Sequence, residues 1–203
     1  MSGQGFTTAI LLAAGGSTRL GRPKQLLAWN GTTLLDSTIR RLAMAGCQRL
    51  IVVLGAYESE IREHCVEPAN VQLDIVTNLD WSKGQATSLR VGVDYAVAVK
   101  DIGSTVIALC DQPLIDLIHY RALISRVNRP GYFAAATEYP EGLGVPACVS
   151  LLALQSLSVS VGDHGAKKWL RKQPLHTVSR VTCPAAAMDI DTEVDYRERL
   201  SHG

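Results

Sequence analysis

The sequence predicts an α/β protein in which a mostly parallel sheet is covered by helices on both faces, as a three-layer α/β/α sandwich. Three largely apolar runs, residues 9–12, 50–54 and 105–109, have the composition of strands buried on both faces. Helix-like segments alternate with these strands along the chain, which is typical of parallel sheets. No repeat or linker divides the 203 residues, so residues 1–203 are expected to form one domain.

The remaining elements follow from apolar spacing and from residues that start or end helices. Gly46 is suited to end the first helix, and Thr192 with Asp195 resembles a capping box that opens the last one. The predicted helices span residues 34–45, 57–65, 86–99, 165–172 and 193–200, and further strands span 71–77, 132–137 and 145–150.

Composition restricts the partners and the compartment. The formal net charge of +1 gives no bulk attraction to nucleic acid or to an anionic membrane, so we expect neither as a partner. The chain has no apolar stretch typical of a signal peptide or a membrane span, and its five cysteines are scattered without a Cys-x-x-Cys pair. These features predict reduced thiols and a cytoplasmic location, without a zinc site or disulfides.

A glycine-rich, basic loop follows the first strand. Gly15, Gly16 and Gly21 allow a tight turn with exposed backbone N–H groups, and Arg19 and Lys24 add positive charge beside them. Such a loop suits a polyphosphate. The pattern is neither a Walker A loop nor a Gly-x-Gly-x-x-Gly fingerprint, so we expect a nucleotide bound without either common motif.

Acidic residues lie where they could meet this loop. Asp111 directly follows a buried strand, which Pro113 prevents from continuing. Its carboxylate could hold Mg²⁺, or it could only cap the next turn. Asp189 and Asp191 flank Ile190 in an extended segment, so alternation sends both side chains to the same side. One of them could complete a metal site with Asp111, or both could belong to a solvated acidic helix start.

Two further segments have open interpretations. Residues 78–89 offer amide and hydroxyl groups suited to a base edge, but alone they are a polar loop and a helix start. Trp81 within them could stack on a ligand or pack beneath its loop. Arg40 and Arg41 form an isolated pair on a predicted helix, which favours a solvated face.

Together these segments resemble the molybdenum cofactor cytidylyltransferase family, within the wider group of nucleotidyltransferases. The resemblance runs from Ala9 to about Tyr196 and implies a Rossmann-like sheet of the nucleotidyltransferase type. Val145 and Lys167 depart from the family pattern, where His and Arg are usual. The matching motifs are residues 12–15, 19–21, 24–27, 110–113, 144–146, 162–166 and 189–192, with Asn78, Trp81, Gly84, Ser88, Leu89 and Gly92.

The resemblance implies transfer of CMP from CTP to the terminal phosphate of the molybdopterin cofactor, with release of pyrophosphate and with Mg²⁺ as cofactor. A molybdenum hydroxylase is the implied recipient of the product. The implied roles are Lys24, Arg19 and Asp111 in catalysis; Leu12, Ala13, Ala14, Gly15, Gly16, Lys24, Asn78, Gly84 and Ser88 in nucleotide binding; Asp111 and Asp191 in metal binding; and Gly144, Pro146, Asp163 and His164 in acceptor binding.

Two alternatives keep the fold and change the activity. A related nucleotidyltransferase could use GTP, or another phosphorylated acceptor such as a sugar phosphate. The Ala13-Ala14-Gly15 form resembles the cytidylyl branch rather than the guanylyl branch, where Ala-Gly-Gly is usual. A non-catalytic nucleotide- or flavin-binding relative is the other alternative. The joint presence of Lys24, Asp111 and Asp191 argues against it, because a pure binder has no need for metal-held phosphates.

Overall fold

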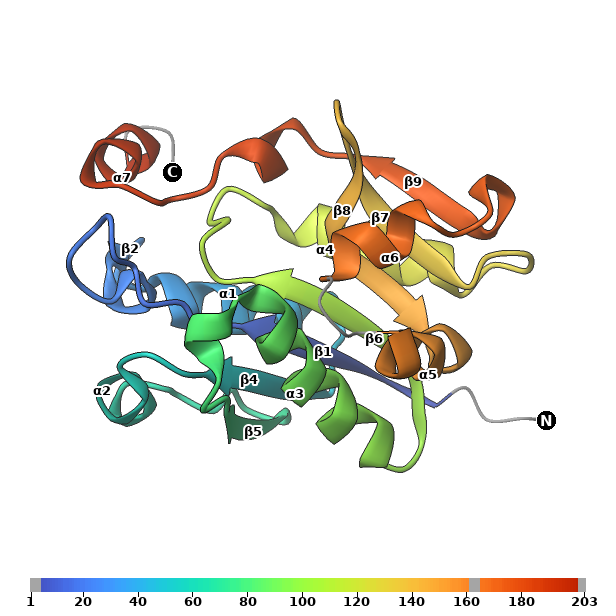
Figure 1. The fold of residues 1–203 in the computed structure, drawn as a ribbon, viewed down its shortest axis with the longest axis horizontal. Helices are drawn as coiled ribbons and strands as arrows, with labels where there is room; N and C mark the ends of the chain where they lie inside the picture. Colours follow the sequence, from blue (N-terminus) through green and yellow to red (C-terminus); the bar gives the residue numbers. More distant parts are fainter. Residues whose placement is uncertain (1–4, 161–164, 201–203) are drawn as a thin grey trace.

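A computed structural model describes residues 5–160 and 165–200 and confirms the predicted sandwich. Seven strands form one sheet in the order β5-β4-β1-β6-β8-β7-β9 (Figure 1). Only β8 runs antiparallel to its neighbours in this sheet. The strands are β1 (Phe6–Leu12), β4 (Arg49–Leu54), β5 (Gln72–Thr77), β6 (Ile102–Leu109), β7 (Ala134–Tyr139), β8 (Gly142–Ser150) and β9 (Val178–Thr182).

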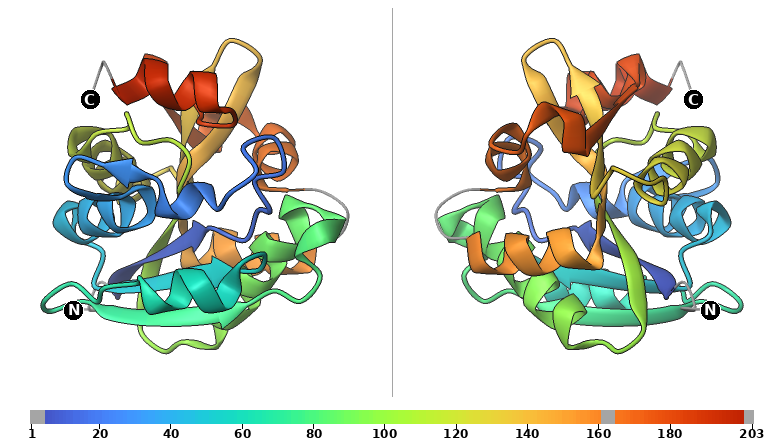
Figure 2. Two further views of the ribbon diagram at one scale, coloured as in Figure 1. Left: turned by 90° about the vertical axis from the view of Figure 1, so that its left-hand side faces the viewer. Right: turned by 90° about the vertical axis from the view of Figure 1, so that its right-hand side faces the viewer.

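Helices cover both faces of the sheet (Figure 2). On one face lie α1 (Leu34–Ala45), α2 (Glu58–Glu63) and α4 (Leu117–Val127). On the other lie α3 (Gln85–Ala98), α5 (Leu151–Ser160) and α6 (Ala166–Arg171). The last helix, α7 (Glu193–Leu200), follows a segment whose Ile190 packs with Trp29 of the short β2–β3 hairpin (Ala28–Trp29 and Thr32–Thr33). None of the helices in the described ranges is long and apolar enough to cross a membrane.

The apolar strands produce two cores because successive side chains point to opposite faces. In β1, Ala9 and Leu11 pack with α1, α2 and α4, whereas Ile10 and Leu12 pack with α3, α5 and α6. All four residues are buried. A continuous apolar run, and not an alternating one, is therefore what a central parallel strand requires here.

The predicted helix ends are largely correct. Gly46 ends α1 with a φ of 107°, a left-handed conformation that glycine adopts without a Cβ penalty. The capping box before α7 forms in both directions: Asp195 N donates to Thr192 Oγ1 (3.2 Å), and Thr192 N donates to Asp195 Oδ2 (2.7 Å). A short local pattern was sufficient to place these ends.

Several elements were not predicted. Helix α5 has no separate apolar stripe, since Leu152 and Val159 are exposed beside its glutamine and serines. Strand β9 is an edge strand whose pairing with β7 joins distant segments. Strand β6 begins at Ile102, and α2 is shorter than the predicted 57–65. These features depend on partners far away in the sequence, which periodicity does not register.

The topology brings two loops together at one edge of the sheet. Strands β1 and β6 are parallel neighbours, so both of their carboxyl ends lie at this edge. The loop after β1 is the glycine-rich segment, and the loop after β6 begins with Cys110 and Asp111. Open α/β sheets bind ligands at such an edge, so we expect these two loops to form the ligand site.

Candidate functional site

The glycine-rich loop is held from inside by Gln25. This side chain is fully buried, and its Nε2 donates to the carbonyls of Ala13 (2.6 Å) and Gly15 (3.0 Å). Ser17, with a φ of 48°, turns the chain so that its Oγ accepts from Lys24 N (3.1 Å). Gln25 lies in a family motif, but the sequence predicted no role for it; its position between Lys24 and two apolar leucines was the available signal.

Trp81 packs against the loop from outside. A Cβ at Gly16 would lie 2.9 Å from the Trp81 ring, and one at Gly55 would lie 2.5 Å from the Trp81 Cβ. These two glycines are therefore needed for the close approach of the indole. The structure thus favours packing for Trp81, which at the same time forms part of the cavity wall.

A cavity of about 300 Å³ opens between the glycine-rich loop and the start of α3. Of the predicted nucleotide-binding residues, it is lined by Leu12, Ala13, Ala14, Gly15, Gly16, Lys24, Gly84 and Ser88. Asn78 does not line it. Its Nδ2 instead donates to Thr87 Oγ1 (2.8 Å) and Ser88 Oγ (2.9 Å), so Asn78 orients the cavity wall from behind.

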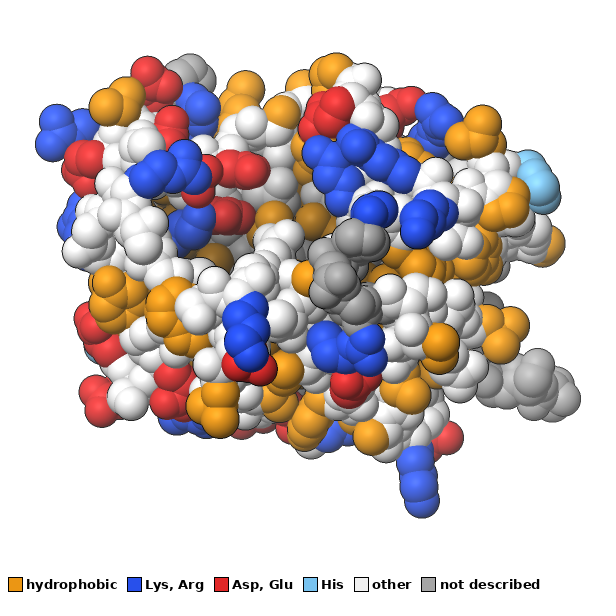
Figure 3. Space-filling model, viewed as in Figure 1, with side chains coloured by type: hydrophobic (Ala, Val, Ile, Leu, Met, Phe, Trp, Pro, Cys, Tyr) orange, Lys and Arg blue, Asp and Glu red, His pale blue; other side chains and the backbone are white. Residues whose placement is uncertain are grey.

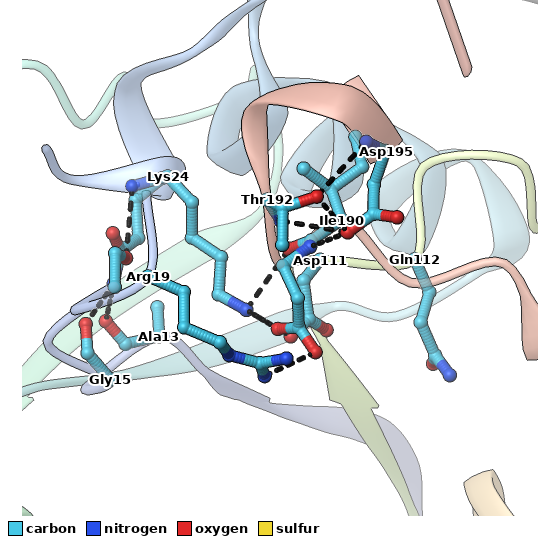
Figure 4. A network of polar contacts seen from close by, with 12 residues as sticks. Ala13, Gly15, Arg19, Lys24, Asp111, Gln112, Ile190, Thr192 and Asp195 are labelled. Atoms are coloured by element: carbon cyan, nitrogen blue, oxygen red, sulfur yellow. Dashed lines mark hydrogen bonds and ion pairs between the residues drawn. The ribbon is translucent and has the colours of Figure 1, made fainter. Parts of the chain in front are cut away.

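Lys24 joins the two predicted metal ligands. Its Nζ lies 2.6 Å from Asp111 Oδ2 and 3.0 Å from Asp191 Oδ1 (Figure 4). The side chains of Lys24 and Asp111 are only 12% and 18% exposed. Burial acts to lower the pKa of Lys24, but the two carboxylates outweigh it and raise that pKa well above its usual range. The lysine is therefore a fixed positive charge.

The geometry fits a divalent metal better than a turn cap at Asp111. Among the described residues, the only hydrogen-bond partner of this carboxylate is Lys24, and Oδ1 is buried without a partner. A carboxylate that capped a turn would accept backbone N–H groups. The described ranges contain no group of three or more His, Cys, Asp and Glu side chains that could hold a metal. Two carboxylates, with phosphate oxygens and water, are a normal set for Mg²⁺.

The rim of the site ties the segment before α7 to the glycine-rich loop. Arg19 pairs with Asp191 (2.7 Å), and Arg22 pairs with Glu193 (2.9 Å). These are exposed pairs, in contrast to Lys24 with Asp111. Ile190 N donates to Asp111 O (2.9 Å), which fixes Asp191 beside the end of β6. The three predicted catalytic residues thus meet at one place.

A second cavity of about 290 Å³ adjoins the first and shares Leu12, Gln85 and Leu109 with it. Gly144 and Asp189 line this second cavity. Pro146, predicted on the acceptor side, is buried and does not line it; its carbonyl accepts from Thr137 Oγ1 (2.6 Å). The other two predicted acceptor residues, Asp163 and His164, lie outside the described residues.

The prediction that Asp189 and Asp191 point to the same side is wrong, because only Asp189 lines the second cavity. Asp191 contacts Lys24, whereas Asp189 lines the second cavity with Gln112, whose side chain points away from Lys24 in Figure 4. Burial, followed by the negative charge of Asp111, raises the pKa of Asp189 to about 6. The lysine and Arg19 instead hold the pKa of Asp191 below its usual value, against the effect of burial.

Basic side chains border the second cavity. Figure 3 shows Lys and Arg side chains gathered over α6. Lys167 and Arg171 of this helix, with Lys83 across from them, surround an open hollow. Glu141 pairs with Lys167 (2.8 Å) and partly offsets this charge. The open side of the second cavity therefore favours an anionic ligand.

Two further residues, Arg41 and Cys110, lie near the site. The prediction of a solvated face for Arg40 and Arg41 is wrong for Arg41, whose guanidinium donates to the carbonyls of Pro113 and Ile115. Cys110 is buried. Burial raises the pKa of its thiol to about 12, so it is no nucleophile.

Comparison with protein families and curated proteins gives one family model and relatives with two different activities. A family model described as a MobA-like NTP transferase domain matches residues 9–178. The nicotine blue oxidoreductase of Paenarthrobacter nicotinovorans is 33% identical over 196 residues, which cover 91% of this chain and 92% of that protein. The molybdenum cofactor cytidylyltransferase of Escherichia coli K12 is 36% identical over 84 residues, which cover 41% of this chain and 42% of that protein.

A solved structure extends the likeness to nearly the whole chain. The complex of Rv0371c from Mycobacterium tuberculosis with manganese matches with a TM-score of 0.73 and 29% sequence identity. The match covers 98% of this chain and 100% of that one. A protein with this fold has therefore been observed with a divalent metal.

Proposed function

Because this chain belongs to the MobA-like NTP transferase family, we propose that it transfers CMP from CTP to the terminal phosphate of the molybdopterin-bound molybdenum cofactor. The main support is the placement of Lys24 between Asp111 and Asp191, beside the first cavity, which the glycine-rich loop lines. The identity shared with a molybdenum cofactor cytidylyltransferase, although limited to part of the chain, supports the choice of substrates.

In this reaction an oxygen of the acceptor's terminal phosphate attacks the α-phosphorus of CTP. The new P–O bond forms as the bond to the β-phosphate oxygen breaks, and pyrophosphate leaves with the electron pair. No covalent nucleophile is needed, so the protein aligns two anions and neutralises charge. Lys24, Arg19 and the amides of Gly15 and Gly16 stabilise the charge that grows on pyrophosphate.

Asp111 and Asp191 hold the metal in this proposal. The buried Oδ1 of Asp111 supports this role, since a buried carboxylate oxygen without a partner is costly and a metal would provide one. When bound, Mg²⁺ supplies positive charge beside the α-phosphate. Lys24 neutralises the same two carboxylates and keeps them in place for the metal.

In this proposal each cavity binds one of the two substrates. Ala13, Ala14, Gly84 and Ser88 surround cytosine, with Asn78 orienting Ser88 from behind. The second cavity receives the acceptor, whose anionic groups match the basic side chains over α6. Because the cavities share three residues, the acceptor phosphate can reach the α-phosphorus at their junction.

Pyrophosphate release with CTP and with GTP, in the presence of Mg²⁺ and molybdenum cofactor, tests the proposal. We expect kcat/KM to favour CTP by roughly tenfold to a hundredfold, because a pocket built for a pyrimidine leaves a purine poorly fitted. A matched reaction without the cofactor measures hydrolysis of CTP alone. Equal or faster turnover of GTP would refute the choice of nucleotide.

A second candidate is an oxidoreductase that binds a flavin or another nucleotide cofactor in the same cavity. The observation in its favour is the extent of the match to nicotine blue oxidoreductase, which spans 91% of this chain. The absorption spectrum of the purified protein tests it, because a bound flavin absorbs visible light. A colourless protein that releases pyrophosphate supports the transferase, and a flavin-loaded one without transfer supports the oxidoreductase.

A further inference from the structure

Arg41 cross-links helix α1 to the loop that follows Asp111. Its Nη1 donates to the carbonyl oxygens of Ile115 (2.7 Å) and Pro113. Its Nε and Nη2 donate to Ser37 O (3.1 Å) and Ser37 Oγ (3.0 Å) on the same helix. The planar guanidinium thus holds two loop carbonyls while its other edge is fixed to α1.

The loop held by Arg41 is the one that aims Asp111. Only Gln112 separates Asp111 from Pro113. Past the end of β6, the backbone N–H of Ile115 donates to the carbonyl of Gln112 (3.3 Å), which closes a tight turn directly after Asp111. A shift of the Pro113 and Ile115 carbonyls would therefore rotate the backbone that carries the Asp111 side chain.

Asp111 has little else to fix its orientation. Within the described ranges its side chain contacts Lys24, which belongs to the other loop, and its Oδ1 has no partner. The backbone carbonyl of Asp111 accepts from Ile190 N (2.9 Å), which restrains one side of the residue. Arg41 supplies a restraint on the side that follows it in the chain.

Arg40 offers a natural comparison. It is the preceding residue on α1 and is exposed, and no hydrogen bond or ion pair of its side chain is present in the described structure. The two residues carry the same charge and lie on the same helix, but only Arg41 contacts the loop after Asp111. Arg40 therefore controls for the loss of a positive charge from this helix.

We propose that Arg41 is a positioning residue for metal binding, which acts by holding the turn after Asp111 against α1. The proposal rests on the proposed function, in which Asp111 is a metal ligand. Residues that orient metal ligands change metal affinity or activity by about ten- to a hundredfold when they are removed. We expect an effect of this size from Arg41.

The test measures Mn²⁺ binding directly, by the loss of the free Mn²⁺ signal in electron paramagnetic resonance. The variants are Arg41→Ala, Arg41→Lys, Arg41→Met, Arg40→Ala and Asp111→Asn, each with its melting temperature and its pyrophosphate release at increasing metal concentration. Arg41→Ala should raise the Mn²⁺ dissociation constant about tenfold or more. The Mn²⁺ dissociation constant of Arg40→Ala should equal that of the unchanged protein. The constant of Arg41→Lys should lie between those of the unchanged protein and Arg41→Ala, because an ammonium can hold the loop carbonyls but not Ser37 as well.

The outcomes separate the two proposals. If Asp111→Asn weakens Mn²⁺ binding but Arg41→Ala lowers only the melting temperature, Arg41 is merely structural and the inference is wrong. If Asp111→Asn leaves Mn²⁺ binding unchanged, the metal site itself is wrong and both proposals fall. Should Arg41→Ala not fold, Arg41→Met decides, because methionine keeps most of the apolar stem but cannot donate to the loop carbonyls: Mn²⁺ binding equal to that of the unchanged protein refutes the positioning role.

Discussion

Replacing Lys24 with methionine should damage both catalysis and stability, for separable reasons. Methionine keeps most of the apolar stem and removes the ammonium that lies 2.6 Å from Asp111. The loss of one preorganised charge contact costs on the order of 10²–10³ in rate. The loss of one partner of a buried ion pair costs about 3–5 kcal/mol in free energy of unfolding. We expect the lower end, about 3 kcal/mol, because Arg19 still pairs with Asp191.

The assay is urea denaturation followed at several pH values, together with pyrophosphate release. Arg22→Met is the matched control, since Arg22 forms an exposed pair with Glu193 and such pairs contribute about 0–1 kcal/mol. Asp111→Asn in the Lys24→Met background should recover part of the lost stability, because it removes the uncompensated carboxylate.

The pH dependence follows from the signs of the pKa shifts. The pKa of Asp191 is lowered by folding, so its contribution is present above its unfolded value near 3.8 and is lost as pH falls through the folded value. The pKa of Lys24 is raised, so its contribution is present below 10.5 and is lost as pH rises through the folded value. The difference in unfolding free energy between Lys24→Met and the unchanged protein should therefore be greatest between about pH 4 and 10. Equal stability and equal turnover at pH 7 would refute this account of Lys24.

Two other predictions concern close packing and the second cavity. Gly55→Ala should lower the free energy of unfolding by about 1–3 kcal/mol, because its Cβ would lie 2.5 Å from that of Trp81, whereas Gly15→Ala has open space and should leave the melting temperature unchanged. Asp189→Asn should alter the pH dependence of stability: the raised pKa of Asp189 makes the unchanged protein lose stability as pH rises from about 4 to about 6, and the variant should lack this loss in urea denaturation. Equal melting temperatures for Gly55→Ala and Gly15→Ala would contradict the first explanation. The second would be contradicted if the unfolding free energy of Asp189→Asn changed with pH as it does in the unchanged protein.

The sequence by itself determined the layers of the fold and most of the first cavity. Central parallel strands must be apolar on both faces, so β1, β4 and β6 are evident as continuous apolar runs. Local chemistry fixed the glycine-rich loop and the caps at Gly46 and Thr192, because these depend on neighbours a few residues away.

Only the tertiary structure decided how distant residues pair. It placed Asp191 on Lys24 and Asp189 in the second cavity, although alternation had put both on the same side of one segment. It also turned Arg41, which a helix pattern alone assigns to solvent, toward carbonyls 72 and 74 residues away. Such partners meet because parallel strands bring their carboxyl ends to one edge of the sheet, and helical or strand periodicity contains no information about which loops meet there.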